Sequence, residues 1–111
     1  MAVGEISAMQ DSHQAWVQYN FPGQPAWQPL LGICEEAGEL CHAHLKGEQG
    51  IRAVGPEKKE DALGDIFIYM MSYANAEGLD LESCILKAWA EVSQRDWRKY
   101  PKTGMPAEER V

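Results

Sequence analysis

An acidic helical motif occupies residues 33–41, where the sequence reads Ile33-Cys34-Glu35-Glu36-Ala37-Gly38-Glu39-Leu40-Cys41. Each residue of an α-helix turns about 100°, so the three glutamates share one side of the predicted helix. Glu36 should border the apolar face, with Glu35 and Glu39 fanning outward from it. Like charges this close destabilise an isolated helix by roughly 0.2–0.5 kcal/mol. A divalent cation such as Mg²⁺, which takes oxygen ligands, would offset this repulsion; a solvated acidic face is the alternative interpretation.

A second acidic pair lies in the next helical pattern of the chain. Asp61 and Asp65 are one helical turn apart, and from Ile66 onward this pattern is apolar almost all round, which is typical of a buried helix. A carboxylate on the inner part of such a helix is unfavourable unless it is paired or bound to a metal ion. An ion pair or a helix-terminal charge is the alternative for Asp61. The five acids predicted to form one metal site are Glu35, Glu36, Glu39, Asp61 and Asp65.

Helical patterns extend over nearly the whole chain. We predict helices over residues 5–19, 27–45 and 57–77 and a fourth helix that starts near residue 81, separated by breaks that contain Pro or Gly. No strand pattern, internal repeat or low-complexity segment competes with these helices. The predicted fold class is therefore all-α, an antiparallel bundle of about four helices.

Length, composition and charge limit the domain count and the partners. The 111 residues, 45% of them apolar, predict one domain over residues 1–111, in which residues 102–111 form a mobile tail. Domains of this size bury their surface incompletely, so we expect the core to be completed by oligomerisation. The net charge of −7 argues against nucleic acid or an anionic membrane as the main partner.

The sequence indicates neither a membrane segment nor a disulfide framework. No signal-peptide pattern stands at the N-terminus, and no apolar run approaches the length of a membrane span. Cys34, Cys41 and Cys84 are odd in number and lack CxxC spacing, so we predict buried, reduced thiols. Reduced thiols imply a cytoplasmic localisation.

The acidic motifs belong to an ordered set of segments. Glu35-Glu36-Ala37-Gly38-Glu39 is followed by Leu63-Gly64-Asp65-Ile66-Phe67-Ile68-Tyr69, then by Gly78-Leu79-Asp80-Leu81 and Arg98-Lys99-Tyr100-Pro101. Over roughly residues 10 to 102 the chain thereby resembles the MazG-like, all-α nucleoside triphosphate pyrophosphohydrolases. The signature of that family is EExxE on one helix and ExxD on the next. Ala62 stands where the signature has its ExxD glutamate, and we expect Asp61 to take over that role.

The resemblance implies a Mg²⁺-dependent enzyme, with Mn²⁺ as an alternative ion, that hydrolyses a nucleoside triphosphate to a monophosphate and pyrophosphate. Glu36, Glu39 and Asp65 would be the primary metal ligands, with Glu35 and Asp61 as second-ion ligands or water-orienting bases. Among them, Glu35, Glu36, Glu39 and Asp65 are the expected catalytic residues. Two ions could bridge phosphate oxygens and activate a water molecule. The resemblance also implies a homodimer or homotetramer in which the pocket is completed across subunits.

The expected substrate-binding residues are of three kinds: cations for the distal phosphates, aromatic side chains for the sugar and base, and one acid that faces the site. A solubilising helix end is the alternative for the cations of the basic segment, and core packing is the alternative for the aromatic residues. The cations are Lys46, Arg95 and Lys99, the aromatic residues are Trp16 and Tyr69, and the acid is Asp96.

Two other functions stay open at this point. Glu39-Leu40-Cys41-His42 is an ExxH motif, as in carboxylate-bridged di-iron bundles, but such proteins need two of these motifs and the chain has one. His42 is therefore predicted to be a surface residue, and His44 to lie on the apolar face. A non-catalytic regulatory or scaffold module of the same fold would follow if the change at Ala62 abolished the chemistry.

Overall fold

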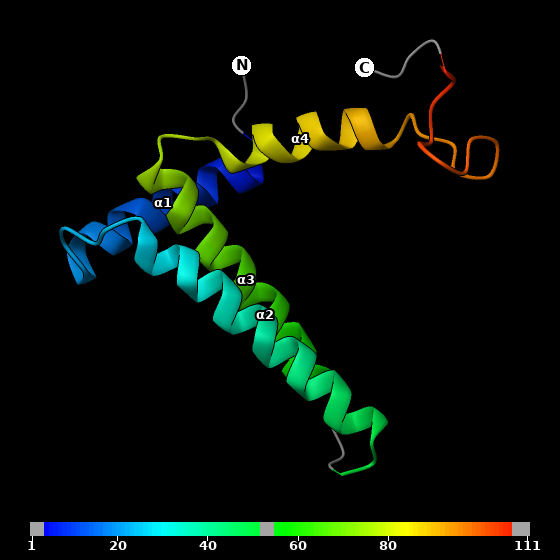
Figure 1. The fold of residues 1–111 in the computed structure, drawn as a ribbon. Coiled ribbons are helices and arrows are strands. Elements are labelled where there is room, and N and C mark those ends of the chain that lie inside the picture. The colour runs from blue at the N-terminus through cyan, green and yellow to red at the C-terminus, as the bar shows by residue number, and fades with distance from the viewer. Residues whose placement is uncertain (1–3, 52–54, 108–111) are drawn as a thin grey trace. The chain divides into compact units, whose positions relative to one another are not determined.

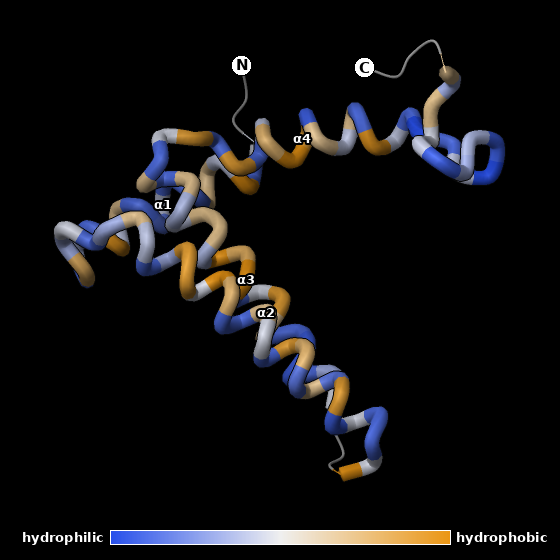
Figure 2. Tube along the Cα trace, viewed as in Figure 1, coloured by the Kyte–Doolittle hydropathy of each residue, from blue (hydrophilic) through white to orange (hydrophobic). Residues whose placement is uncertain are grey.

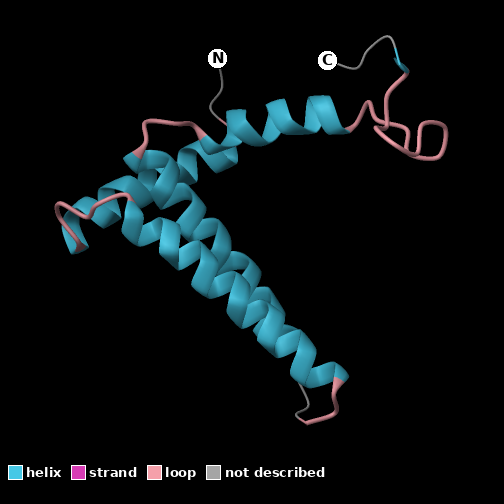
Figure 3. Cartoon of the chain, in the orientation of Figure 1, coloured by secondary structure: helices cyan, strands magenta, loops and turns pink. Residues whose placement is uncertain are grey.

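The computed structural model describes residues 4–51 and 55–107, most of which are helical (Figures 1 and 3). The helices are α1 (Glu5–Asn20), α2 (Trp27–Glu48), α3 (Pro56–Ala76) and α4 (Leu81–Val92). No strand occurs in those residues, so the predicted all-α class is confirmed. Helix α2 continues past Leu45, its predicted end, and the N–H of Gln49 then donates to the Leu45 carbonyl.

The chain divides into two compact units that meet between Leu81 and Glu82. The first unit contains α1, α2 and α3, and the second contains nearly all of α4 and the turns that follow it. That the whole chain forms one domain stays a prediction.

Two helix–helix contacts build the first unit. Helices α2 and α3 lie side by side along most of their length, and α1 packs against α3 (Figure 1). The chain reverses direction between α2 and α3, so these two helices are antiparallel. Gly32 of α2 lies against the ring of Tyr69 of α3 and allows the two backbones to approach closely.

A buried amide joins α1 to the C-terminal end of α3. Gln10 is only 5% exposed, and its Nε2 donates to Asn75 Oδ1 and to the Leu79 carbonyl, both at 2.8 Å. The N–H of Leu81 donates to Gln10 Oε1 at 2.8 Å, and Asn75 Nδ2 donates to the Gln10 carbonyl at 3.1 Å. The amide nitrogen and the amide oxygen of Gln10 thus both have hydrogen-bond partners. The side chain can therefore be buried without a large cost in free energy.

The apolar core is small. Its buried residues include Ala62, Met71, Ala74 and Leu81. Figure 2 shows apolar positions recurring along α2 and α3, but Phe67 and Ile68 are 45% and 40% exposed. The prediction that α3 is buried on most sides from Ile66 onward is confirmed for residues 69–75, which are buried or half-buried, but not for Phe67 and Ile68. Completion of the core by oligomerisation stays a prediction.

The three cysteines are free and exposed, so the prediction that they are buried is wrong. Cys34 and Cys41 are seven positions apart on α2 and therefore share one face of the helix. No helix of the described residues is long and apolar enough to cross a membrane. The cytoplasmic localisation stays a prediction.

The second unit ends in a tight series of turns. Asp96 Oδ1 accepts the backbone N–H groups of Arg98 and Lys99 at 3.1 and 2.9 Å. The N–H of Asp96 donates to the Gly104 carbonyl at 2.8 Å, and Gly104 has a φ of +76°, which favours glycine. The last of these bonds reaches Gly104, which belongs to the predicted tail; residues 108–111 lie outside the described part.

Candidate metal centre

A cavity of about 810 Å³ lies along the groove between α2 and α3. Each of the two antiparallel helices carries acids on the side that faces the other, so both contribute acids to the lining of the cavity. The cavity is also lined by small residues, which leave room at its centre. Its lining comprises Glu35, Glu36, Gly38, Glu39, His42, Ala43, Lys46, Lys58, Asp61, Ala62 and Asp65.

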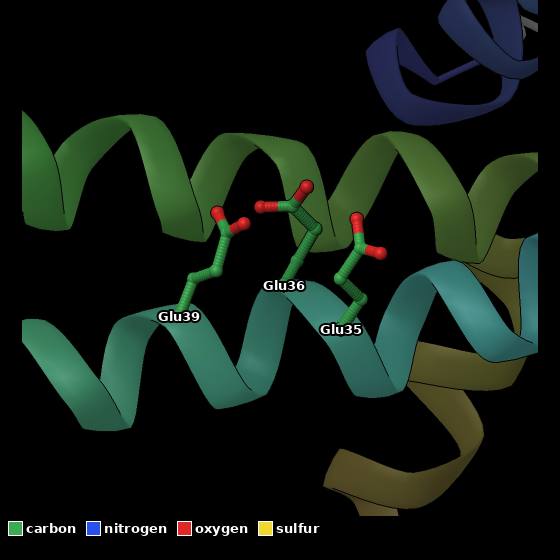
Figure 4. A group of neighbouring side chains, drawn as sticks. All are labelled: Glu35, Glu36 and Glu39. Carbon is green, nitrogen blue, oxygen red and sulfur yellow. The ribbon is translucent and has the colours of Figure 1, made fainter.

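Three glutamates of α2 form the closest group of acids in this cavity. One carboxylate oxygen from each of Glu35, Glu36 and Glu39 lies within 4.8 Å of the other two. Figure 4 shows the three side chains leaving α2 toward α3. Glu36 is 9% exposed, whereas Glu35 and Glu39 are exposed. The expected arrangement, with Glu36 at the edge of the buried face and the other two fanning outward, is confirmed.

Glu36 is the most perturbed acid of the group. Its Oε2 is buried and has no hydrogen-bond partner. Burial raises the pKa of Glu36 above its ordinary value, and the neighbouring charges of Glu39, Asp65 and Glu35 raise this pKa further. Every one of these causes disfavours a negative charge at Glu36. A positive charge placed beside Glu36 would offset these effects.

The two aspartates of α3 lie on the opposite wall of the cavity. Asp61 and Asp65 are both exposed, and between them Ala62 is 6% exposed. Asp65 is near enough for its charge to raise the pKa of Glu36. Neither aspartate belongs to the group of three acids whose oxygens lie within 4.8 Å of one another. The structure thus brings the glutamates together and leaves the aspartates at a larger distance across the groove.

The sequence did not predict that Lys58 and His42 line the cavity, and the position predicted for His44 is wrong. Lys58 precedes Asp61 by three positions, a spacing that places both on one face of α3 and could have identified the lysine. His42, predicted to be a surface residue, is exposed but lines the cavity. His44, predicted on the apolar face, is exposed and pairs with Glu48, its Nε2 lying 3.7 Å from Oε1. The prediction for His44 is therefore wrong, because an exposed side chain beside Glu48 does not lie on the buried face.

The expected substrate-binding residues are spread over both units. Lys46 lines the cavity, whereas Trp16 and Tyr69 are absent from its described lining. Trp16 is 53% exposed and stacks on His13, with ring centroids 5.7 Å apart. The Tyr69 ring packs against Gly32.

The remaining three expected residues, Arg95, Asp96 and Lys99, belong to the second unit. The carboxylate of Asp96 accepts two backbone N–H groups there, and Lys99 Nζ lies 5.5 Å from the centre of the Tyr100 ring. Their part in substrate binding stays a prediction.

The donor atoms of the centre are carboxylate oxygens from two antiparallel helices, in an open cavity. Hard divalent cations such as Mg²⁺ prefer such ligands and usually keep several water molecules, which an open cavity accommodates. The residues present therefore fit a Mg²⁺ ion. Comparisons of this chain with protein-family models, with curated proteins and with solved structures found no match.

Proposed function

We propose that this protein is a Mg²⁺-dependent nucleoside triphosphate pyrophosphohydrolase of the MazG-like type, which releases a nucleoside monophosphate and pyrophosphate. The observation that carries the proposal is the buried, unpartnered Oε2 of Glu36, in the middle of a group of three glutamates. A solvated acidic face would leave each carboxylate free to reach water. A buried acceptor among like charges is unfavourable as an anion, and a bound cation would relieve this at neutral pH.

The acids divide into two roles in this proposal. Glu36 and Glu39, with Asp65 across the groove, would hold the ion; Glu35 and Asp61 would bind a second ion or orient the attacking water. When bound, the metal supplies charge neutralisation for the triphosphate and activation of water. The chain's own contribution is to fix the acids on two packed helices, so that their geometry needs little reorganisation when the substrate binds.

A non-catalytic module is the second candidate function, and the observation that favours it is Ala62. This alanine lines the cavity at the position where the family signature has a glutamate. If Asp61 does not replace that ligand, the fold would persist without turnover. A di-iron bundle has less support, because the chain has a single ExxH motif.

Pyrophosphate release from a panel of nucleoside triphosphates tests the enzyme directly. We expect Mg²⁺-dependent turnover by the full chain, abolished by Glu39→Gln and unaffected by Glu60→Gln, because Glu60 lies on α3 outside the described lining of the cavity. Turnover with Mn²⁺ in place of Mg²⁺ should persist. Binding of Mg²⁺ without turnover of any nucleotide would favour the non-catalytic module. Turnover that survives Glu39→Gln would contradict the assignment of the site.

A homodimer or homotetramer is part of this proposal. Large apolar side chains on the surface of the described residues support it, among them Leu31, Phe67 and Trp89 at 59%, 45% and 63% exposure. Light scattering coupled to gel filtration gives the mass in solution. A monomer at micromolar concentration would contradict this part of the proposal.

A further inference from the structure

The charges in the cavity between α2 and α3 are separated along the groove. Glu35, Glu36 and Glu39 come first on α2, and Lys46 follows Glu39 by seven positions, about 10 Å at 1.5 Å per residue. On α3, which runs in the opposite direction, Lys58 precedes Asp61 by three positions, about 4.5 Å. The two lysines therefore lie together at the end of the groove where α2 leads into α3. The acids occupy the rest of its length.

Neither lysine is neutralised by the acids that share its cavity. Lys46 Nζ has an amide partner, Gln49 Oε1 at 3.4 Å, and lies more than 4.0 Å from every carboxylate of the described residues. Lys58 is exposed and likewise lies beyond 4.0 Å from those carboxylates, although Asp61 is one turn away on the same helix. The cavity thus holds unpaired cations at one end and an excess of acids at the other.

We propose that Lys46 and Lys58 bind the terminal phosphates of the substrate, which lies along the groove with its metal-bound phosphates beside Glu36. This inference rests on the proposed function and gives the substrate a direction. An anion that carries metal at one end and free phosphate oxygens at the other matches the order of charges in the groove. Lysine Nζ–H groups donate to phosphate oxygens as charge-assisted hydrogen bonds.

In this orientation of the substrate, the two lysines contact the leaving group, pyrophosphate. In the hydrolysis, the oxygen of water bonds to the α-phosphorus, and the bond from this phosphorus to the oxygen that bridges it to the β-phosphorus breaks. That oxygen leaves with the electron pair as part of pyrophosphate, and the proton of the water passes to a base or to solvent. Cations at the β- and γ-phosphates stabilise the charge that develops there. Lys46 and Lys58 would therefore bind the product pyrophosphate as well as the substrate.

Calorimetry on the full chain tests the proposal in two steps that use no turnover. Mg²⁺ alone is titrated first, and pyrophosphate is then titrated in saturating Mg²⁺. The ionic strength is kept fixed, because salt screens the attraction between lysine and phosphate. The variants are Lys46→Gln, Lys58→Gln and, as a matched control outside the described lining, Lys59→Gln. We expect the Kd of pyrophosphate to rise roughly tenfold for each of the first two variants. The Kd of Mg²⁺ should stay close to that of the wild type, which also shows that the variants are folded.

The outcomes separate this inference from the proposed function. Pyrophosphate affinity that is unchanged in both Lys46→Gln and Lys58→Gln, while Mg²⁺ still binds, overturns the role of the lysines and leaves the metal centre standing. An equal loss in Lys59→Gln also overturns it, because the effect would then reflect net charge alone. If Mg²⁺ does not bind to the wild type in the first step, the proposed function fails and the inference fails with it.

Discussion

The ring of Tyr69 fills the space in which a Cβ atom of Gly32 would lie. A Cβ built on Gly32 would come within 2.5 Å of ring atoms Cδ1 and Cε1, well inside van der Waals contact. This close approach sets the spacing of α2 and α3 on the side of the acids nearest α1. The metal centre is built on the same two helices, so its geometry depends on this contact.

We predict that Gly32→Ala destabilises the first unit. The methyl group would push the Tyr69 ring or separate α2 from α3, and overpacking of this kind typically costs about 1–3 kcal/mol. Gly38→Ala is the control, because a Cβ at Gly38 meets no atom within 4 Å. In the control, the helical preference of alanine should stabilise the protein by roughly 0.5–1 kcal/mol. Urea unfolding followed by circular dichroism measures both, and a Gly32→Ala variant as stable as the control would contradict the packing.

We predict that Gln10→Ala also destabilises the first unit, because it removes buried hydrogen bonds. Gln10→Ala removes the acceptor of the Leu81 N–H and the donor to Asn75 and the Leu79 carbonyl. Buried groups left unsatisfied cost about 1–3 kcal/mol each, so a loss in that range or above is expected. Gln14→Ala, at an exposed position of α1, is the control. Hydrogen exchange at the Leu81 amide should accelerate in Gln10→Ala only.

The sequence was sufficient to predict the helices and the acids that line the cavity. It was insufficient to predict which apolar residues and cysteines are buried. Helix periodicity and Pro or Gly breaks predict the four helices, and the acids at helical spacing predict which residues line the groove. The position of Glu36 at the edge of the buried face also follows from the helical angle. Periodicity does not reveal which apolar faces are covered, so the exposure of Cys34 and Phe67 was not predicted. The place of Lys58 in the lining was not predicted either.

The raised pKa of Glu36 predicts a pH dependence of stability in the metal-free protein. Below the ordinary value of 4.5, Glu36 is protonated in both the folded and the unfolded state and contributes nothing. Between 4.5 and the raised pKa, the folded state binds more protons, so the free energy of unfolding falls as pH increases. Above the raised pKa, Glu36 is ionised in both states, and the folded state keeps the full free-energy cost of this charge. Glu36→Gln should therefore be more stable than the wild type at pH 7, with a difference that vanishes below pH 4.5.

Thermal unfolding from acidic to neutral pH in the presence of a chelator measures this difference. Glu60→Gln is the matched control, since Glu60 is exposed and lies outside the described lining of the cavity. Its stability relative to the wild type should show no comparable trend. If Glu36→Gln is no more stable than the wild type at neutral pH, repulsion at Glu36 does not destabilise the fold.

Addition of Mg²⁺ should make the wild type more stable than Glu36→Gln at neutral pH. A ligand that binds only the folded state stabilises it by about 2.7 kcal/mol at a concentration one hundred times its Kd. The wild type should gain this stability at neutral pH, whereas Glu36→Gln, which lacks the central carboxylate, should gain far less. Melting temperatures at increasing Mg²⁺ concentrations test this, with Ca²⁺ as a probe of size selectivity. Equal gains in both proteins would show that the ion does not use Glu36.

Asp61 and Ala62 decide how the second helix contributes to the centre. Asp61→Asn should weaken Mg²⁺ binding at least tenfold if Asp61 takes the role of the missing glutamate. Even the loss of a residue that only hydrogen-bonds to a metal ligand typically lowers metal affinity about 10–100-fold. Ala62→Glu in the Asp61→Asn background should restore part of the affinity, because position 62 lines the same cavity. Ala62→Gln in that background is the control for the added volume at this 6% exposed position and should restore nothing. Wild-type affinity in Asp61→Asn would exclude Asp61 as a ligand, and Asp65 would then be the aspartate through which α3 binds the ion.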